Sequence, residues 1–97
     1  MKKLILSARA REDLRSIGLY IAQERPHSAS EVIAHIVKRM QTVSMYPQIG
    51  EAVDILHPGM RRYSAGTYVI YFRPTSKCVR ILRILHGAQD AESQFLS

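Results

Sequence analysis

Apolar residues early in the chain recur at the spacing of one helix face. Four of them follow each other at intervals of four, three and four residues: Ala10, Leu14, Ile17 and Ile21. These intervals place the four side chains on one side of a helix, where they can pack against a core. Ser7 precedes the run and is the expected N-cap, and Pro26 is expected to end the helix or to begin the turn after it.

A second apolar stripe follows after a short gap. It consists of Ile33, Ile36, Val37, Met40 and Val43. Ser28 and Glu31 stand three residues apart, as in a capping box, and predict where this helix begins. Two antiparallel helices joined by a short turn are therefore expected.

The remaining apolar pattern predicts strands. Residues 2–6 suit a short first strand, and three more strands are expected at residues 60–64, 67–73 and 78–85. The connections between the last three are short enough for hairpins, so these strands should form an antiparallel meander. The chain is thus predicted to be one α+β domain, residues 1–97, with a helical hairpin packed on one face of a small sheet.

Strict alternation along the last strand leaves neither of its faces purely apolar. One face would carry Arg80, Leu82, Ile84 and His86, and the other Val79, Ile81, Arg83 and Leu85. Arg83 either lies at a sheet margin, reaching solvent or pairing with Asp90, or it belongs to a working surface. That surface would include Arg61, Arg62 or Arg73. Arg61 and Arg62 are adjacent and point to opposite faces, so at most one of them serves any single surface.

Charge is distributed unevenly along the chain. The net charge is +6, and no Asp or Glu occurs between residues 55 and 89. Six cations fall in that stretch: Arg61, Arg62, Arg73, Lys77, Arg80 and Arg83. The other eight Lys and Arg residues are matched by the eight Asp and Glu residues, so the rest of the chain is balanced. A concentrated positive field attracts polyanions or acidic protein segments.

Length and cysteine content narrow the class of protein. A chain of 97 residues has room for a single modest core. The one cysteine, Cys78, cannot form an internal disulfide, which fits a reducing compartment such as the cytosol. The sequence shows no signal peptide or membrane span, so we expect a cytoplasmic protein without a membrane partner. The tail, residues 91–97, is expected to form a short closing helix or to lie against the domain.

Several blocks of the sequence resemble the ParE toxins of the ParE/RelE superfamily, and together they span nearly the whole chain. They are Leu6–Ile21, Tyr46–Gly50, Pro58–Tyr63, Ala65–Arg73 and Ile81–Asp90. The last block is the most specific. Many relatives carry Arg where this chain has Gln89, at a position that varies within the family.

The resemblance implies the toxin of a bacterial type II toxin–antitoxin system that inhibits DNA gyrase by protein–protein binding. A ParD-like antitoxin, acidic and folding as it binds, would neutralise it in a hetero-oligomer. The antitoxin is expected to contact Leu19, Tyr20, Val32, Arg73 and Arg83. The surface expected to meet the target consists of Arg61, Arg73, Arg83, His86 and Asp90.

The main alternative is a ribosome-dependent mRNA endonuclease that resembles RelE. Cleavage through the 2′-hydroxyl needs a base, an acid and cations, and arginine can supply only the cations. His86, with Arg83 and Arg61, would then form the catalytic set. His57 or one of the tyrosines Tyr63, Tyr68 and Tyr71 could also serve as base or acid. For His86 the competing interpretation is a structural hydrogen bond at the strand end, for example to Asp90.

The strand tyrosines and Phe72 could stack on bases, which suggests a plain nucleic-acid binder as a third possibility. It ranks below both toxin hypotheses, because only the toxin family accounts for the helix pair and the sheet blocks together. No phosphate-binding glycine loop, paired cysteines or two-histidine metal spacing is visible, so neither a cofactor nor a metal is expected.

Overall fold

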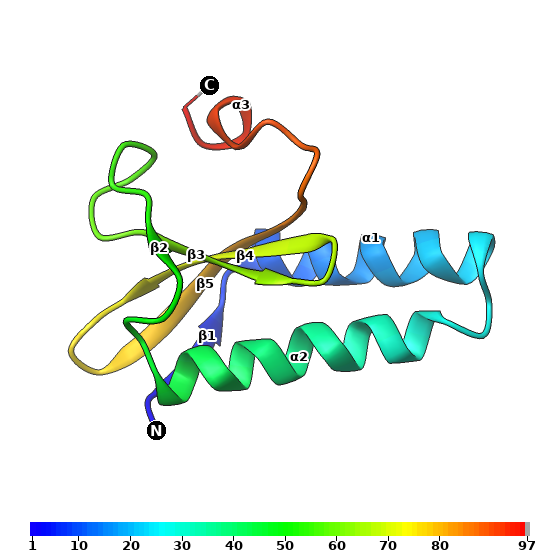
Figure 1. The fold of residues 1–97 in the computed structure, drawn as a ribbon, viewed down its shortest axis with the longest axis horizontal. Coiled ribbons are helices and arrows are strands. Elements are labelled where there is room, and N and C mark those ends of the chain that lie inside the picture. The colour runs from blue at the N-terminus through cyan, green and yellow to red at the C-terminus, as the bar shows by residue number, and fades with distance from the viewer. Residues whose placement is uncertain (97) are drawn as a thin grey trace.

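A mixed sheet carries two long helices on one side and a short helix on the other (Figure 1). The computed structural model describes residues 1–96. The elements in chain order are β1 (Lys3–Leu6), α1 (Ala8–Glu24), α2 (Ala29–Met45), β2 (Glu51–Ala52), β3 (Arg61–Ala65), β4 (Tyr68–Pro74), β5 (Cys78–His86) and α3 (Ala91–Phe95). The sheet has five strands in the order β1-β5-β4-β3-β2, which confirms the predicted α+β class.

The two long helices lie where the apolar stripes predicted them. Ser7 is the N-cap of α1, and its Oγ accepts a hydrogen bond from the Ala10 backbone N at 3.0 Å, as expected. The capping box predicted for α2 is wrong, because Ser28 already has helical dihedral angles and makes no side-chain cap bond. An N-cap residue needs an extended backbone before its oxygen can reach the first free N–H groups of the helix.

The antiparallel meander of β3, β4 and β5 is confirmed, with bounds within a residue of those predicted. The first strand pairs with β5 in parallel, and Leu4 lies opposite Val79. An edge strand, β2, was not predicted. It has only two residues, which is too short for any alternation of apolar and polar side chains to be visible.

A β-bulge in β5 overturns the strict alternation expected for that strand. Tyr71 lies opposite Arg83, whereas the next residue, Phe72, lies opposite Ile81, so Leu82 is an extra residue in the ladder. An extra residue reverses the faces of everything that follows it. Ile84 consequently joins Ile81 in the core on the helix side, although alternation predicted opposite faces for these two residues.

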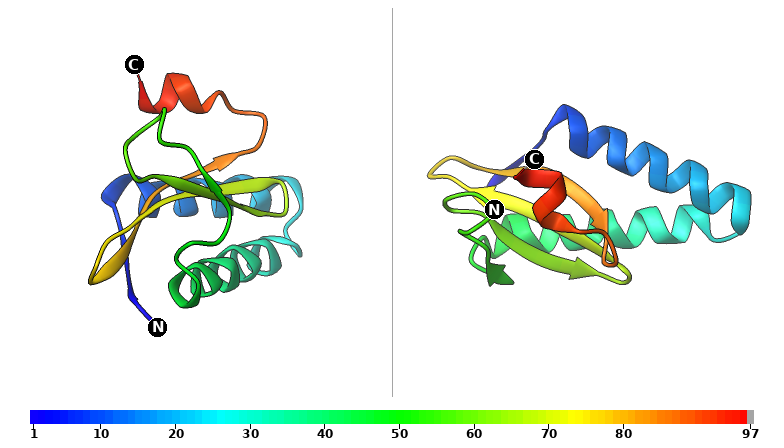
Figure 2. Two further views of the ribbon diagram at one scale, coloured as in Figure 1. Left: turned by 60° about the vertical axis from the view of Figure 1, so that its left-hand side comes forward. Right: turned by 90° about the horizontal axis from the view of Figure 1, so that it is seen from above.

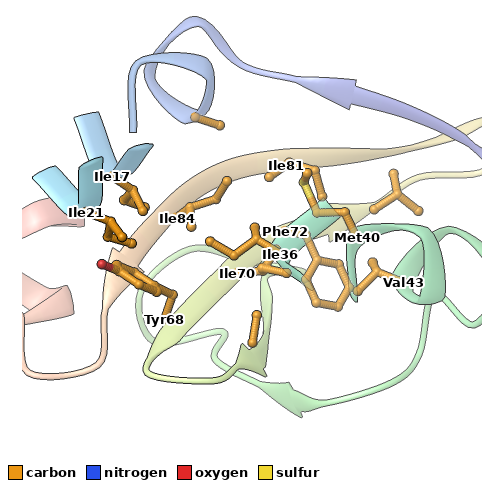
Figure 3. Close-up of a cluster of buried hydrophobic side chains, with 13 residues drawn as sticks. Ile17, Ile21, Ile36, Met40, Val43, Tyr68, Ile70, Phe72, Ile81 and Ile84 are labelled. Carbon is orange, nitrogen blue, oxygen red and sulfur yellow. The ribbon is translucent and has the colours of Figure 1, made fainter. Parts of the chain in front are cut away.

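The main core lies between the two long helices and the sheet (Figure 3). Phe72 and Ile70 of β4 and Ile36 of α2 are fully buried at its centre. Burying such side chains removes apolar surface from water and is the main favourable term in folding. The helical pattern and the β-rich central strand therefore meet in one cluster.

A second, smaller cluster covers the opposite face of the sheet. Met60, Val69, Tyr71 and Leu85 form it, and the partly buried Phe95 of α3 packs against it. The Phe95 and Tyr71 ring centroids are 5.2 Å apart. The tail therefore forms the closing helix that was one of the two expectations for it, while Ser97 lies outside the described residues.

The closed end of the helical hairpin projects beyond the sheet, as Figure 1 and the right-hand view of Figure 2 show. His35 of α2 lies beside the β3–β4 turn at Gly66, and the closed end of the hairpin extends past that turn. Within residues 1–96, no helix is both long and apolar enough to cross a membrane.

The two serines that precede the helices provide a matched test of capping. We expect Ser7→Ala to lower the free energy of unfolding by about 1–2 kcal/mol, because Ser7 Oγ also donates to the Leu82 carbonyl at 2.9 Å. Ser28→Ala should change it by less than about 0.5 kcal/mol, since its hydroxyl caps nothing. Urea unfolding followed by circular dichroism measures both, and equal losses would contradict the assignment.

Candidate functional site

Arg83 and Asp13 form a buried ion pair that joins β5 to α1. Arg83 Nε donates to Asp13 Oδ2 at 2.8 Å, and Arg83 Nη2 donates to Asp13 Oδ1 at 2.9 Å. The remaining nitrogen, Nη1, donates to Gln94 Oε1 of α3 at 3.1 Å. The side chains of Arg83 and Asp13 are 11% and 14% exposed. One guanidinium thus ties together elements from both faces of the sheet.

The local fold explains why the pair forms here. β1 ends at Leu6, so β5 has no strand partner on that side beyond Ile81. Beyond Ile81, side chains accept hydrogen bonds from the backbone N–H groups along this edge of β5. Asp13 Oδ2 accepts from Ile84 N at 2.9 Å, and Gln89 Oε1 accepts from His86 N at 2.8 Å. These bonds satisfy backbone groups that would otherwise invite another strand.

Arg83 is therefore a structural cation. Hydrogen bonding to Asp13 raises the pKa of Arg83 above its ordinary value, against the lowering effect of burial. The expected pairing of Arg83 with Asp90 is wrong. Asp90 is the N-cap of α3, and its Oδ1 accepts from Glu92 N at 3.0 Å. The short loop after β5 fixes Asp90 at the helix start.

Arg61 is also held by the protein's own backbone. Its Nε donates to the Ile49 carbonyl at 3.1 Å, and its Nη2 donates to the carbonyls of Gln48 and Gly50 at 2.7 and 3.0 Å. Gly50 has a φ of 82°, and a Cβ there would lie 2.1 Å from the Arg62 carbonyl oxygen. The turn preceding β2 is thus built around the Arg61 side chain.

The residues proposed for a nuclease are not brought together. Arg83 is bound to Asp13 and Gln94, and Arg61 to the turn before β2, so neither presents a free guanidinium beside His86. His86 is exposed, and its Nδ1 accepts from the Ala88 backbone N at 3.1 Å. The strand-end hydrogen bond expected for His86 therefore exists, but its partner is not Asp90.

A groove of about 710 Å³ opens where the helical hairpin overhangs the sheet. Its helical side comprises Ser16, Ile17, Tyr20, Ile21, Arg25, Glu31, Val32 and His35, and its sheet side comprises residues 65–68, His86 and Gln89. The His86 and Tyr68 rings meet edge to face, with centroids 5.5 Å apart. The groove combines apolar walls with a few charged groups at its rim, as ligand sites commonly do.

Two of the three helical residues expected to contact an antitoxin, Tyr20 and Val32, line this groove. Leu19 is 54% exposed but does not line it. Arg73 lies at the far end of β4, and its Nε is buried without a hydrogen-bond partner. The residues expected to contact an antitoxin are therefore distributed over several parts of the molecule, and one of them, Arg83, is buried.

Asp13 was missed as a structural residue, although its signal is present in the sequence. It stands three residues after Ala10 and four before Ile17, on the face of α1 that the apolar stripe buries. A carboxylate on a buried face requires a cation, and Arg83 was the odd cation among aliphatic residues. Both exceptions are visible in the sequence, but only the packing of α1 against β5 shows that they pair with each other.

Among residues 1–96, no group of three or more His, Cys, Asp or Glu side chains is placed to hold a metal ion.

The chain matches the family model described as "ParE toxin of type II toxin-antitoxin system, parDE" over residues 4–91. It is 29% identical over 94 residues to Toxin ParE1 of Caulobacter vibrioides, covering 96% of this chain and 97% of that protein. Toxin ParE1 of Mycobacterium tuberculosis is 28% identical over 65 residues, which are 66% of each chain.

Solved structures share the fold. The chromosomal ParDE system from P. aeruginosa contains a chain with a TM-score of 0.77 at 24% identity, covering 89% of this chain and 96% of that one. YafQ from E. coli has a TM-score of 0.53 at 15% identity, covering 91% and 96%. The architecture therefore extends from ParE to YafQ-like proteins.

Breaking the buried pair should destabilise the fold strongly. We expect Arg83→Met to lower the free energy of unfolding by about 3–5 kcal/mol, because the Asp13 carboxylate would lose its cation. Arg15→Met is the matched control. It removes an exposed pair with Glu12 whose side chains are 70% and 62% exposed, and should cost under about 1 kcal/mol.

The Arg83–Asp13 pair also determines how the free energy of unfolding should depend on pH. A raised pKa means that the contribution of Arg83 is complete below its ordinary pKa and is lost only as pH rises through the higher folded value. The difference in unfolding free energy between wild type and Arg83→Met should therefore stay constant from about pH 6 to 9. Urea titrations across that range test this, and a difference that shrinks toward pH 9 would contradict it.

Proposed function

Because the chain belongs to the ParE toxin family of type II toxin–antitoxin systems, we propose that it inhibits DNA gyrase and is neutralised by a ParD-like antitoxin. The match to the family over residues 4–91 is the observation that carries this proposal. The net charge of +6 is compatible with it, since a gyrase–DNA complex presents phosphate groups. The site of action would be the cytoplasm, where gyrase and its DNA lie.

We place the antitoxin in the groove beneath the helical hairpin. An amphipathic helix that folds on docking needs accessible apolar surface, and the exposed Tyr20 and the partly buried Val32 supply it. Its acidic segment would meet Arg25 at the groove rim. Arg83 was expected to make that contact, but its guanidinium is already bound to Asp13. Toxin and antitoxin would then form a hetero-oligomer in which the groove is covered.

Inhibition by binding, without catalysis, agrees with the arrangement of the arginines. A ribonuclease of RelE type needs its cations beside the acid and base. Here Arg83 and Arg61 are used to fasten α1 and the turn before β2. The likeness to YafQ supports a shared scaffold, and a scaffold can serve different functions.

A supercoiling assay tests the target. Purified toxin added to gyrase, relaxed plasmid and ATP should abolish supercoiling and trap cleaved DNA, and antitoxin should reverse both effects. Boiled toxin is the control for added protein. Full supercoiling at large excess of folded toxin would reject gyrase as the target. Cleavage of mRNA on translating ribosomes would then establish the nuclease alternative.

Two tyrosines of similar exposure test the antitoxin site. Tyr20 lines the groove and is 60% exposed, whereas Tyr46 lies after α2, outside the groove, and is 63% exposed. We expect Tyr20→Ala to weaken antitoxin binding by at least about tenfold, because a buried tyrosine commonly anchors an interface. Tyr46→Ala should change it less than about twofold. Calorimetric titration measures both, and equal effects would move the interface elsewhere.

A further inference from the structure

Five cations gather at the end of the sheet where the β4–β5 hairpin closes, and Lys2 Nζ donates to the Thr75 carbonyl of that hairpin at 2.5 Å. They are Lys2, Lys3, Arg73, Lys77 and Arg80, and we call this group the cationic end. Arg73 lies directly opposite Arg80, and Lys3 pairs with Cys78, two residues before Arg80. Lys77 is exposed in the hairpin turn that immediately precedes β5. The cationic end and the antitoxin groove are therefore at opposite ends of β4.

Arg73 and Arg80 point to the face of the sheet away from the long helices. Residues directly opposite on paired strands share a face, and Arg73 alternates with Phe72, which is in the core on the helix side. The apolar part of this outer face is covered by α3 and by residues 53–60. What remains open at the cationic end is charged.

Within the described chain, none of these residues forms an ion pair with an Asp or Glu side chain. The two ion pairs within residues 1–96 are Arg15–Glu12 and Arg83–Asp13. The Nε of Arg73 is buried and has no hydrogen-bond partner. Like charges directly opposite each other on paired strands are destabilising. Arg73 and Arg80 therefore face each other as like charges, and neither has an ion-pair partner in the described chain.

Arg73 is also held in place before any ligand arrives. A Cβ at Gly59 would lie 3.6 Å from its Cγ and Cδ, so the loop before β3 passes over the aliphatic part of Arg73. A side chain that is already ordered loses less entropy when it binds. The neighbouring Arg80 and Lys3 are exposed and open to a partner.

We propose that the cationic end binds the phosphate backbone of duplex DNA. Arginine forks match phosphate oxygens, and backbone binding needs positive charge without an apolar surface. An acidic protein segment that folds on docking needs apolar area as well, which lies at the groove and not here. The choice of duplex DNA as the polyanion rests on the proposed function, in which the toxin acts on gyrase engaged with DNA. Contact with DNA beside the enzyme would anchor the toxin in that complex.

Fluorescence anisotropy with a labelled duplex of about 20 base pairs tests the proposal on the full chain without gyrase. Arg80→Gln should weaken binding about tenfold at about 50 mM salt and reduce the slope of log affinity against log salt by about one. Arg9→Gln is the control, since it removes the same charge from an exposed position on α1. Circular dichroism verifies that both variants fold.

Three results would overturn the proposal. They are no duplex binding at low salt, equal effects of Arg80→Gln and Arg9→Gln, and tighter binding of polyglutamate than of the duplex. The last result would assign the cationic end to an acidic protein. A selective effect of Arg80→Gln on duplex affinity supports the proposal whether or not the toxin inhibits gyrase. The supercoiling assay decides the proposed function separately.

Discussion

The packing of this protein depends on how the open edge of β5 is closed. The parallel partner of β5, strand β1, ends at Leu6. The bulge at Leu82 reverses the face of the sheet to which the side chains beyond it point. Asp13 reaches this edge from α1, where it accepts hydrogen bonds from Ile84 N and from Nε and Nη2 of Arg83. A buried charge is tolerated only when it is paired and fully hydrogen-bonded. The pair therefore fixes the register of α1 against the sheet, and through Gln94 it also fixes α3.

The excess positive charge is divided between structure and surface by the fold. The guanidinium of Arg83 is hydrogen-bonded to the Asp13 carboxylate, and that of Arg61 is hydrogen-bonded to backbone carbonyls of the turn before β2. Arg73 and Arg80 stay unneutralised on the outer face of the sheet. Because Arg61 and Arg83 are bound within the protein, Arg73 and Arg80 are the arginines of the sheet that remain able to bind a partner. That division argues for binding of an anionic partner more than for catalysis by the sheet arginines.

The two surfaces considered for partners are chemically different and spatially separate. The groove has apolar walls from the helical hairpin and suits a helix that buries its own apolar face. The cationic end has charge but little open apolar surface, because α3 and residues 53–60 cover the second cluster. The groove lies at the Tyr68 end of β4, and the cationic end lies at its Pro74 end. An antitoxin in the groove would leave the cationic end uncovered unless its acidic segment extends along the strand.

The helices and the meander could be predicted from the sequence, because apolar periodicity and turn residues are local features. The family could be recognised from its sequence blocks. The spacing of Ala10, Leu14, Ile17 and Ile21 predicted one helix face, and the β-branched and aromatic residues from Tyr68 to Phe72 predicted a central strand. The partner of Arg83 and the bulge at Leu82 were decided by the tertiary structure alone. Asp13 is 70 residues from Arg83 along the chain, and a bulge depends on what the opposite strand and the edge require. Local patterns specify which face a residue shares with its neighbours, whereas the pairing of a buried charge is settled only when distant elements pack together.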